Sequence, residues 1–380
     1  MKDPQFYLEC GYEDTGYVSP NLTSSDIYPD YIEQEVMETV RSVQEKQTYN
    51  TITFGFMTDL HLALTYNHKV RMQRNLNAYK EICKRAQVDF LALGGDYTNE
   101  GCKAYKSDCY RQLRAYFDGI DYYPVNGNHD DGSIWDTSYI KVNGHDNWLS
   151  HDELYRLFYN HLPQKGIKVA EHGLYYYKND NLSKTRYVFL DTNDTPDTIN
   201  EDGTVKYPGQ CNFKMSQKQL DWLVNDALSF DEEGWSVIFV GHSVFRNVDD
   251  IPVGEGDSFE GIRILHDILG SYKSGAVCNV CYGEDEIKQE VNVDFSKRIR
   301  ADVVAMFVGD HHADAVEEYR GIKYILTANS VTYYTGESYQ VPRADGDKTE
   351  ILFDIVTVDK KDRTIYVTRM GAGEDRVVEY

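Results

Sequence analysis

The sequence lacks long hydrophobic runs. No stretch reaches about 18 apolar residues, the length that a membrane-spanning helix needs, so we expect no transmembrane helix and no membrane partner. The first residues, MKDPQFYLECGYEDTGY, also lack the apolar core of a secretory signal. We therefore expect a cytoplasmic protein.

Excess positive charge is missing as well. The chain has 39 Lys and Arg against 62 Asp and Glu, which gives a formal net charge of −23 at pH 7. Nucleic-acid backbones are bound mainly through Lys and Arg, and an acidic surface repels polyanions. We expect no nucleic-acid partner and do not favour a nuclease, although a cleft lined by bound metal ions can still be locally positive.

Cysteine is sparse and scattered, with seven residues in the chain. An odd number without regular spacing is typical of free thiols in a cytoplasmic protein, not of a disulfide framework. Cys278 and Cys281 have the C-x-x-C spacing, but no second pair accompanies them. The sequence therefore does not favour a zinc knuckle.

Short apolar runs rich in Val, Ile, Phe and Tyr recur along the 380 residues, and each has about the length of a strand. They occupy residues 51–61, 88–96, 121–130, 185–194, 234–242, 301–312 and 321–330. Two more strands are predicted in EILFDIVTVD and RTIYVTRMG, which the turn DKKD joins. Neither internal repeats nor low-complexity segments occur, so the length suits one large α/β domain with extensions or two ordinary domains.

Helical segments are predicted around several of these runs. Three lie near residues 29–45, 65–87 and 261–272. A fourth, MSQKQLDWLVNDAL, places Ser216 and Gln219 in the spacing of a capping box.

Polar side chains end five of the apolar runs. They are Asp59 and His61, Asp96, Asn128 with His129, His242, and Asp310 with His312. The carboxyl ends of strands in α/β sheets form the ligand crevice, because loops from different parts of the chain converge there. A single histidine at a strand end is usually structural, but five agreeing strand ends indicate a metal site.

These motifs, taken in order, resemble the signature of the calcineurin-like metallophosphoesterases, and the bacterial phosphoesterases and phosphodiesterases in particular. The motifs are D-x-H from Asp59, G-D at Asp96, G-N-H-D at 127–130, G-H at His242 and glycine–acid–x–His at 309–312. The closing hairpin and RMGAGEDR also resemble the end of bacterial members, so the resemblance covers about residues 50–380.

The resemblance implies an α/β fold, a four-layer α/β/β/α sandwich with two mixed β-sheets. Alternating strands and helices alone would equally allow an ordinary three-layer sheet. We expect residues 1–48 to form an N-terminal extension with one helix, and residues 49–380 to form the catalytic domain. The acidic, Gly-rich segment 246–300 follows a metal-bearing loop, so we interpret it as a specificity insertion over the site.

The resemblance also implies a centre with two divalent metal ions. The first ion would be held by Asp59, His61, Asp96 and His312, and the second by the bridging Asp96 with Asn128, His242 and Asp310. Mixed nitrogen and oxygen ligands suit Mn, Fe or Zn better than Ca. Two such ions can activate a water as a metal-bound hydroxide and clamp the phosphoryl oxygens. The catalytic candidates are Asp96, as the bridging ligand, and His129. His129 would face the substrate and either stabilise the developing charge or protonate the leaving group.

Asp310 departs from the family pattern, which has G-H-x-H at this point. Using His311 as the first histidine fails, because position 313 is Ala. Asp310 and His312 have the same i, i+2 spacing as Asp59 and His61, and in extended chain such residues share a face. We therefore predict Asp310 as a ligand, with His311 either turned aside or supporting a ligand without contacting the metal. The alternative is that Asp310 is an N-cap or a solvated loop residue. An added carboxylate favours Mn.

A second departure from the family pattern narrows the range of expected substrates. Protein phosphatases of the superfamily carry G-D-x-x-D-R, whereas Asn99 and Glu100 occupy the last two positions here. A diester carries one negative charge fewer than a monoester, so its binding is weakened less by the absence of the arginine. The resemblance thus implies hydrolysis of a small-molecule phosphodiester, or a phosphomonoester. The alternative is a non-catalytic binding scaffold with the same fold.

Other polar residues have two interpretations. Asp191, Asn193 and Asp194 in LDTND follow an apolar run and either line the pocket or are ordinary solvated loop residues. Six histidines outside strand ends are interpreted as surface or helix residues: His68, His145, His151, His161, His172 and His266.

Overall fold

The computed structural model describes residues 23–99, 101–133, 148–170, 173–209, 212–244, 260–331 and 341–380. The chain forms two units. The first comprises Met1–Pro124, Gly309–Ala315 and Leu326–Tyr380, and the second comprises Val125–Val308 and Val316–Ile325.

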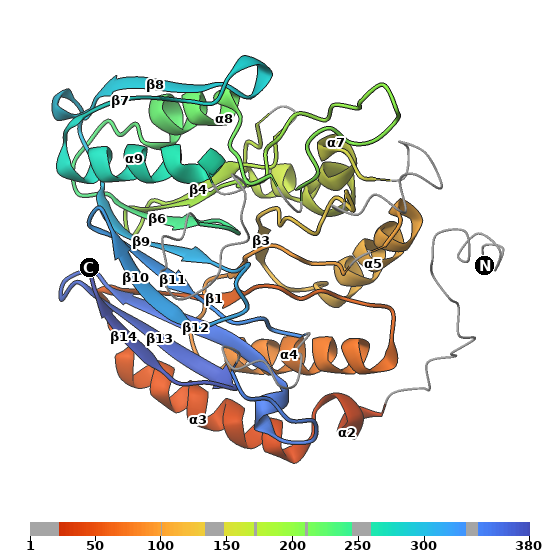
Figure 1. The fold of residues 1–380 in the computed structure, drawn as a ribbon. Coiled ribbons are helices and arrows are strands. Elements are labelled where there is room, and N and C mark those ends of the chain that lie inside the picture. Colours follow the sequence, from red (N-terminus) through yellow and green to blue (C-terminus); the bar gives the residue numbers. More distant parts are fainter. Residues whose placement is uncertain are drawn as a thin grey trace. The chain divides into compact units, whose positions relative to one another are not determined.

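The first unit contains a six-stranded mixed sheet in the order β14-β13-β12-β1-β2-β3 (Figure 1). The strands are β1 (Thr51–Met57), β2 (Leu91–Leu93), β3 (Tyr122–Pro124), β12 (Leu352–Asp359), β13 (Thr364–Gly371) and β14 (Arg376–Glu379). β1, β2 and β3 run parallel, whereas β12, β13 and β14 add antiparallel neighbours on the other side of β1. From Ile52 onward β1 is buried, as expected for a central strand.

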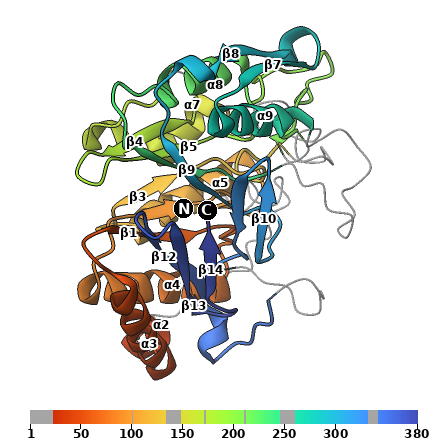
Figure 2. The same cartoon turned by 90° about the vertical axis from the view of Figure 1, so that its left-hand side faces the viewer.

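The helices of the first unit are α2 (Ser24–Ile27), α3 (Asp30–Lys46), α4 (Tyr66–Arg85), α5 (Lys103–Tyr116) and the short 3₁₀ turn η9 (Lys348–Glu350). α3 buries Ile32, Val36, Val40 and Val43, a stripe with helical spacing, and packs against α4 and β13. Figures 1 and 2 both show α3 beside α4. α3 covers the helix expected near residues 29–45, and the shorter α2 precedes it, whereas an N-terminal extension that ends at residue 48 stays a prediction.

A buried ion-pair network ties segment 309–315 to the first sheet. Arg369 on β13 donates to Asp354 on β12 at 2.7 Å and to Asp314 at 2.8 Å, and Arg376 donates to Asp354 at 2.5 Å. Burial alone raises the pKa of Asp354, but the charges of the two arginines outweigh it and the pKa is lowered. The stabilisation is therefore present above the ordinary Asp pKa of about 3.9, and it is lost as the pH falls through the lower folded value.

The second unit holds most of another six-stranded mixed sheet, in the order β10-β11-β9-β6-β5-β4. The strands are β4 (Tyr176–Asp180), β5 (Thr185–Phe189), β6 (Ser236–Val240), β9 (Asp302–Val308), β10 (Ala315–Tyr319) and β11 (Ile322–Leu326). β5, β6 and β9 run parallel, and β4 is antiparallel to β5.

The helices and turns of the second unit are α7 (His151–Leu154), η2 (Tyr155–Tyr159), η3 (Leu162–Lys165), α8 (Gln217–Trp222), η5 (Leu223–Ala227), α9 (Glu260–Ser274), η7 (Asp285–Ile287) and η8 (Phe295–Lys297). The hairpin β7 (Val277–Tyr282) and β8 (Gln289–Asp294) lies beside α9 (Figures 1 and 2). α9 and this hairpin make up most of the predicted insertion 246–300, whose residues 246–259 lie outside the described residues. Its role in specificity stays a prediction.

Two mixed sheets confirm the predicted α/β fold class, and the single-sheet alternative is wrong. Every predicted apolar run contains a strand, but the strands end earlier than the runs, and β2 and β3 have only 3 residues each. The apolar runs of the sequence do not include β4, β7, β8, β10 or β14. No helix in the described part of the chain has the length and apolar composition to cross a membrane.

The capping box predicted at α8 is only half confirmed. Ser216 Oγ accepts from the backbone N–H of Gln219 at 3.2 Å. Gln219 does not complete the box, because its side chain bonds the backbone of Asp191 at 3.0 and 2.8 Å instead. α8 is thus fastened to the loop that follows β5.

We expect Asp354→Ala to lower the free energy of unfolding by about 3–5 kcal/mol, because Arg369 is left buried without its partner. Urea denaturation at pH 7 measures the change. Glu379→Ala, an exposed acid on β14, is the control and is expected to change stability by less than about 0.5 kcal/mol. Equal effects of the two substitutions would contradict a structural role for the network.

Candidate metal centre

The predicted ligands of the first unit lie in turns after the strands, where the backbone is left-handed. The φ angles are 51° at Asp59, 40° at His61, 52° at Asp96, 67° at Asp310 and 51° at His312. Few residues other than glycine adopt such angles, which are typical of functional sites held by their surroundings. We predicted that Asp310 and His312, like Asp59 and His61, share a face of an extended strand. This is wrong, because β1 ends at Met57 and β9 at Val308, so all four residues lie beyond the strands.

Backbone hydrogen bonds hold two of these turns side by side. The N–H of Asp59 donates to Gly95 O at 3.0 Å, and the N–H of His61 donates to Asp96 O at 2.8 Å. The N–H of Leu62 continues the pattern to Tyr97 O at 2.9 Å. The turns after β1 and β2 thus fix each other's unusual conformation.

The structure brings four predicted ligands together, Asp59, His61, Asp96 and His312. The Nε2 atoms of His61 and His312 lie 2.9 Å apart. His61 Nε2 is 3.4 Å from Asp96 Oδ2, and His312 Nε2 is 3.3 Å from Asp59 Oδ1. One ligand atom from each residue lies within 4.8 Å of every other. Two nitrogens and two carboxylate oxygens therefore face one small volume.

This donor set fits a divalent transition metal. Bonds of about 2.0–2.2 Å to Zn²⁺ or a similar ion place neighbouring ligand atoms about 3–3.5 Å apart, as these are. Asp59 is fully buried and Asp96 nearly so, and buried carboxylates need a compensating cation. Burial alone lowers the pKa of His312, but the hydrogen bond and charge of Asp59, with the charges of Asp96 and Asp310, raise it. The site thus attracts positive charge.

Thr58 and Gly309, whose roles the sequence patterns do not predict, set the position of the Asp59 carboxylate. Thr58 Oγ1 donates to Asp59 Oδ2 at 2.6 Å, and the backbone N–H of Asp310 donates to both carboxylate oxygens at 3.1 Å. A Cβ at position 309 would collide with Thr58 Oγ1 and Asp59 Oδ2, so Gly309 allows this approach. Thr58 and Gly309 are therefore positioning residues.

Asp310 contacts Asp59 through its backbone, and its side chain is not one of the four clustered ligands. Asp310 Oδ2 lies 3.8 Å from His311 Nε2. No helix begins at residues 310–314 in the described chain, so the N-cap alternative is wrong. The assignment of Asp310 to a second ion stays a prediction.

In the second unit, Asn128 and His242 lie together. Asn128 Oδ1 is 2.9 Å from His242 Nε2, and both residues are buried. Asp130 Oδ2 accepts from the N–H of Gly127 at 2.9 Å, which fixes the turn that carries Asn128 and the half-buried His129. Their roles in binding a second ion and in catalysis stay predictions.

Three further acidic and amide residues are not solvated. Asp191, Asn193 and Asp194 are buried after β5, so their interpretation as ordinary loop residues is wrong. Of the six other histidines, His266 on α9 is buried in the core, where burial lowers its pKa to about 3. His145 and His172 lie outside the described residues.

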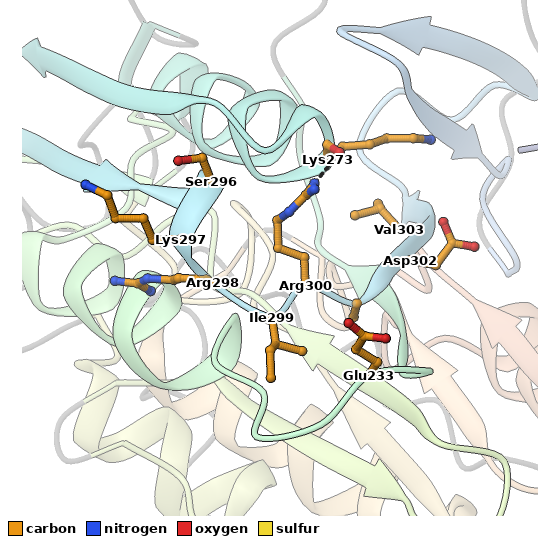
Figure 3. Close-up of a pocket in the computed structure, with 10 residues that line it drawn as sticks. Glu233, Lys273, Ser296, Lys297, Arg298, Ile299, Arg300, Asp302 and Val303 are labelled. Carbon is orange, nitrogen blue, oxygen red and sulfur yellow. Dashed lines mark hydrogen bonds between the residues drawn. The ribbon is translucent and has the colours of Figure 1, made fainter.

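A hollow of about 590 Å³ in the second unit is separate from these predicted ligands, none of which lines it (Figure 3). Its basic side chains already have partners. Arg300 donates to the carbonyl oxygens of Tyr272 and Lys273 at 2.9 and 2.7 Å, and Lys297 pairs with Asp294 at 2.7 Å. The two Arg300 bonds cap the C-terminal end of α9, which is a structural role.

We expect Thr58→Val to weaken Mn²⁺ binding about 10–100-fold, because Asp59 loses the donor that orients it. Calorimetric titration of the metal-free protein measures the affinity. Thr53→Val, the same change at a buried position of β1, is the matched control. Equal affinities for the two variants would contradict the positioning role.

Solved structures of other proteins resemble this chain. A dimetal phosphatase from Danio rerio has 14% identity and a TM-score of 0.51, with 87% of this chain and 99% of that chain covered. A putative 5′-nucleotidase from Staphylococcus aureus has 11% identity and a TM-score of 0.40, with 87% and 54% covered. GAP50 of Plasmodium, an anchor in the inner membrane complex, has 13% identity and a TM-score of 0.42, with 84% of each chain covered. The first likeness shows a shared fold.

No curated protein matches the sequence. A family model does match it, that of the calcineurin-like phosphoesterases, over residues 52–246, which is half of the chain. The matched segment contains the turns that carry Asp59, His61 and Asp96. The chain therefore belongs to the calcineurin-like phosphoesterase family.

Proposed function

We propose that this protein is a metal-dependent phosphoesterase that hydrolyses a small-molecule phosphodiester in preference to a monoester. The observation that carries the proposal is the buried convergence of Asp59, His61, Asp96 and His312 within 4.8 Å in a member of this family. A scaffold that binds no metal gains nothing from two imidazoles and two carboxylates held in left-handed turns, since each such turn costs free energy.

Two ions are proposed, with Mn²⁺ favoured. Asp59, His61, Asp96 and His312 would hold the first, and Asp96, Asn128, His242 and Asp310 the second. When bound, such ions supply an activated water and electrostatic stabilisation of the phosphoryl oxygens. The third carboxylate, Asp310, in place of the usual histidine makes the ligand set harder, which favours Mn over Zn.

His129 is the proposed general acid. It follows Asn128 directly, in the turn that Asp130 fixes through the N–H of Gly127. That connection would place the imidazole beside Asn128 without making it a metal ligand. Its protonated ring would neutralise charge on the leaving oxygen or donate its proton there.

The preference for a diester rests on positions 99 and 100. Asn99 stands where protein phosphatases of the superfamily have an acid, and Lys106 Nζ donates to its backbone carbonyl at 2.9 Å. Glu100, in place of the arginine, lies outside the described residues. A substrate with one negative charge fewer is less dependent on a guanidinium partner.

We expect the metal-free protein to be inactive and Mn²⁺ to restore hydrolysis, with bis-p-nitrophenyl phosphate cleaved faster than p-nitrophenyl phosphate. His129→Ala should lower kcat about 10²–10⁴-fold, the usual contribution of a general acid. Release of p-nitrophenol measures both rates. Absence of turnover with Mn²⁺, Fe²⁺, Zn²⁺ and Mg²⁺ would overturn the proposed enzymatic activity and favour the binding scaffold. Faster hydrolysis of the monoester than of the diester would overturn only the proposed diester preference.

We expect Asp310→Ala to lower bound Mn²⁺ by about one ion per chain, because the second ion loses a carboxylate. Asp310→His, which restores the family pattern, should retain the ion and raise activity with Zn²⁺ relative to Mn²⁺. Plasma mass spectrometry after desalting counts the ions. His311→Ala is the control for the neighbouring residue, and a greater loss of metal in that variant would show that His311 is the ligand.

A further inference from the structure

A second group of metal-binding side chains lies within the second unit and contains none of the ligands predicted from the sequence. It consists of His151, Asp191 and Asp194. His151 is the first residue of α7, and the two acids follow β5. Asp191 is fully buried, Asp194 is 7% exposed, and the His151 side chain is 12% exposed.

The three side chains direct one ligand atom each at a common point. His151 Nε2 is 3.7 Å from Asp191 Oδ2 and 4.0 Å from Asp194 Oδ1. Both His151 Nε2 and Asp191 Oδ2 are buried without a hydrogen bond from the described residues. A buried carboxylate oxygen that accepts no hydrogen bond is costly and calls for an explanation.

The other oxygen of each carboxylate is already bonded to the protein. Asp191 Oδ1 accepts from Asn126 Nδ2 at 3.2 Å and from the N–H of Asn193 at 2.9 Å. Asp194 Oδ2 accepts from Ser216 Oγ at 2.5 Å and from Gln219 Nε2 at 3.0 Å. These donors fix both carboxylates, so that the remaining oxygens face His151. Such support of ligands by neighbouring hydrogen bonds is typical of metal sites.

His151 is oriented in the same way by a fourth acid. Its Nδ1 lies 2.8 Å from Asp197 Oδ1, and its backbone N–H donates to Asp197 Oδ2 at 3.1 Å. A carboxylate on Nδ1 keeps the proton there and leaves the Nε2 lone pair for a metal, which is the carboxylate–histidine–metal arrangement.

The charges also favour an ion. Three carboxylates surround one imidazole, so protonation of His151 alone leaves an excess of two negative charges among these groups. A divalent ion compensates more of the charge than a single proton does.

We propose that His151 Nε2, Asp191 Oδ2 and Asp194 Oδ1 bind a third divalent transition-metal ion, such as Mn²⁺ or Zn²⁺, in a structural site. Bonds of about 2.0–2.2 Å place ligand atoms about 3–3.5 Å apart, so the distances from His151 Nε2 to the two carboxylate oxygens need to shorten by roughly 0.2–1 Å on metal binding. Water completes the coordination. The ion links the start of α7 to the loop after β5, and through Asn126 to the turn that carries Asn128.

The proposal is tested by counting metal in the full chain after removal of metal and reconstitution with Mn²⁺. Asp194→Asn and His151→Gln are each expected to lose one ion per chain relative to the parent. Asp231→Asn, which removes the same charge from an exposed position of the second unit, should lose none. Circular dichroism confirms that each variant is folded. Unchanged metal content in both folded variants would overturn the site and leave a buried histidine–carboxylate ion pair.

Anomalous diffraction from crystals of the parent protein with Mn²⁺ provides the second measurement and does not depend on the folding of a variant. We expect a peak between His151 Nε2 and the two carboxylates. Peaks at Asp59–His312 without one at His151 would overturn this inference and leave the proposed function intact. A peak at His151 alone would support this inference and overturn the proposed catalytic centre.

Discussion

The carboxylate of Asp59 is the group on which the candidate centre of the first unit depends. It is fully buried, and it accepts hydrogen bonds from the hydroxyl of Thr58 and the backbone N–H of Asp310. One of its oxygens lies 3.3 Å from His312 Nε2. One acid thereby joins the end of β1 to a loop 251 positions later in the chain. A buried negative charge of this kind needs strong hydrogen-bond donors and a compensating cation. Thr58 and Asp310 supply the donors, and the proposed metal would be the cation.

Left-handed backbone at the ligands adds a cost that the fold must offset. Each non-glycine residue in this region costs of order 1–2 kcal/mol, and several ligands adopt it. The paired turns after β1 and β2 hold these angles through backbone hydrogen bonds, and the ion-pair network of Asp354 anchors segment 309–315. Metal binding contributes in the same direction, because its free energy is gained only when the ligands are assembled. Stability and metal content are therefore coupled in this protein.

Local patterns in the sequence predicted most of the strands and the polar residues at their ends, whereas the two-sheet fold and the grouping of the four clustered ligands came from the family resemblance. Asp59 and Asp96 each follow an apolar run within a short motif. Thr58 and Gly309 could not be predicted in the same way, since their roles arise from a contact between distant segments. His151 follows the N-cap Ser150 of a short helix and not a strand, and its acidic partners lie about forty residues further on. Gln219 has the correct spacing for a cap, yet a tertiary contact with Asp191 takes its side chain.

The pairing of β1 with β12 has a consequence for the order in which the protein folds during synthesis. Thr51 pairs with Asp359 and Phe56 with Asp354, so one side of β1 has no neighbour until the ribosome has made residues 354–359. β5, β6 and β9 of the second unit, by contrast, come from the continuous segment Val125–Val308. Contacts between segments close in sequence form sooner than distant ones, and domains fold as they emerge. All strands of the second sheet are therefore made before β12 of the first sheet, and the ion-pair network that anchors segment 309–315 forms only after β13 has been made.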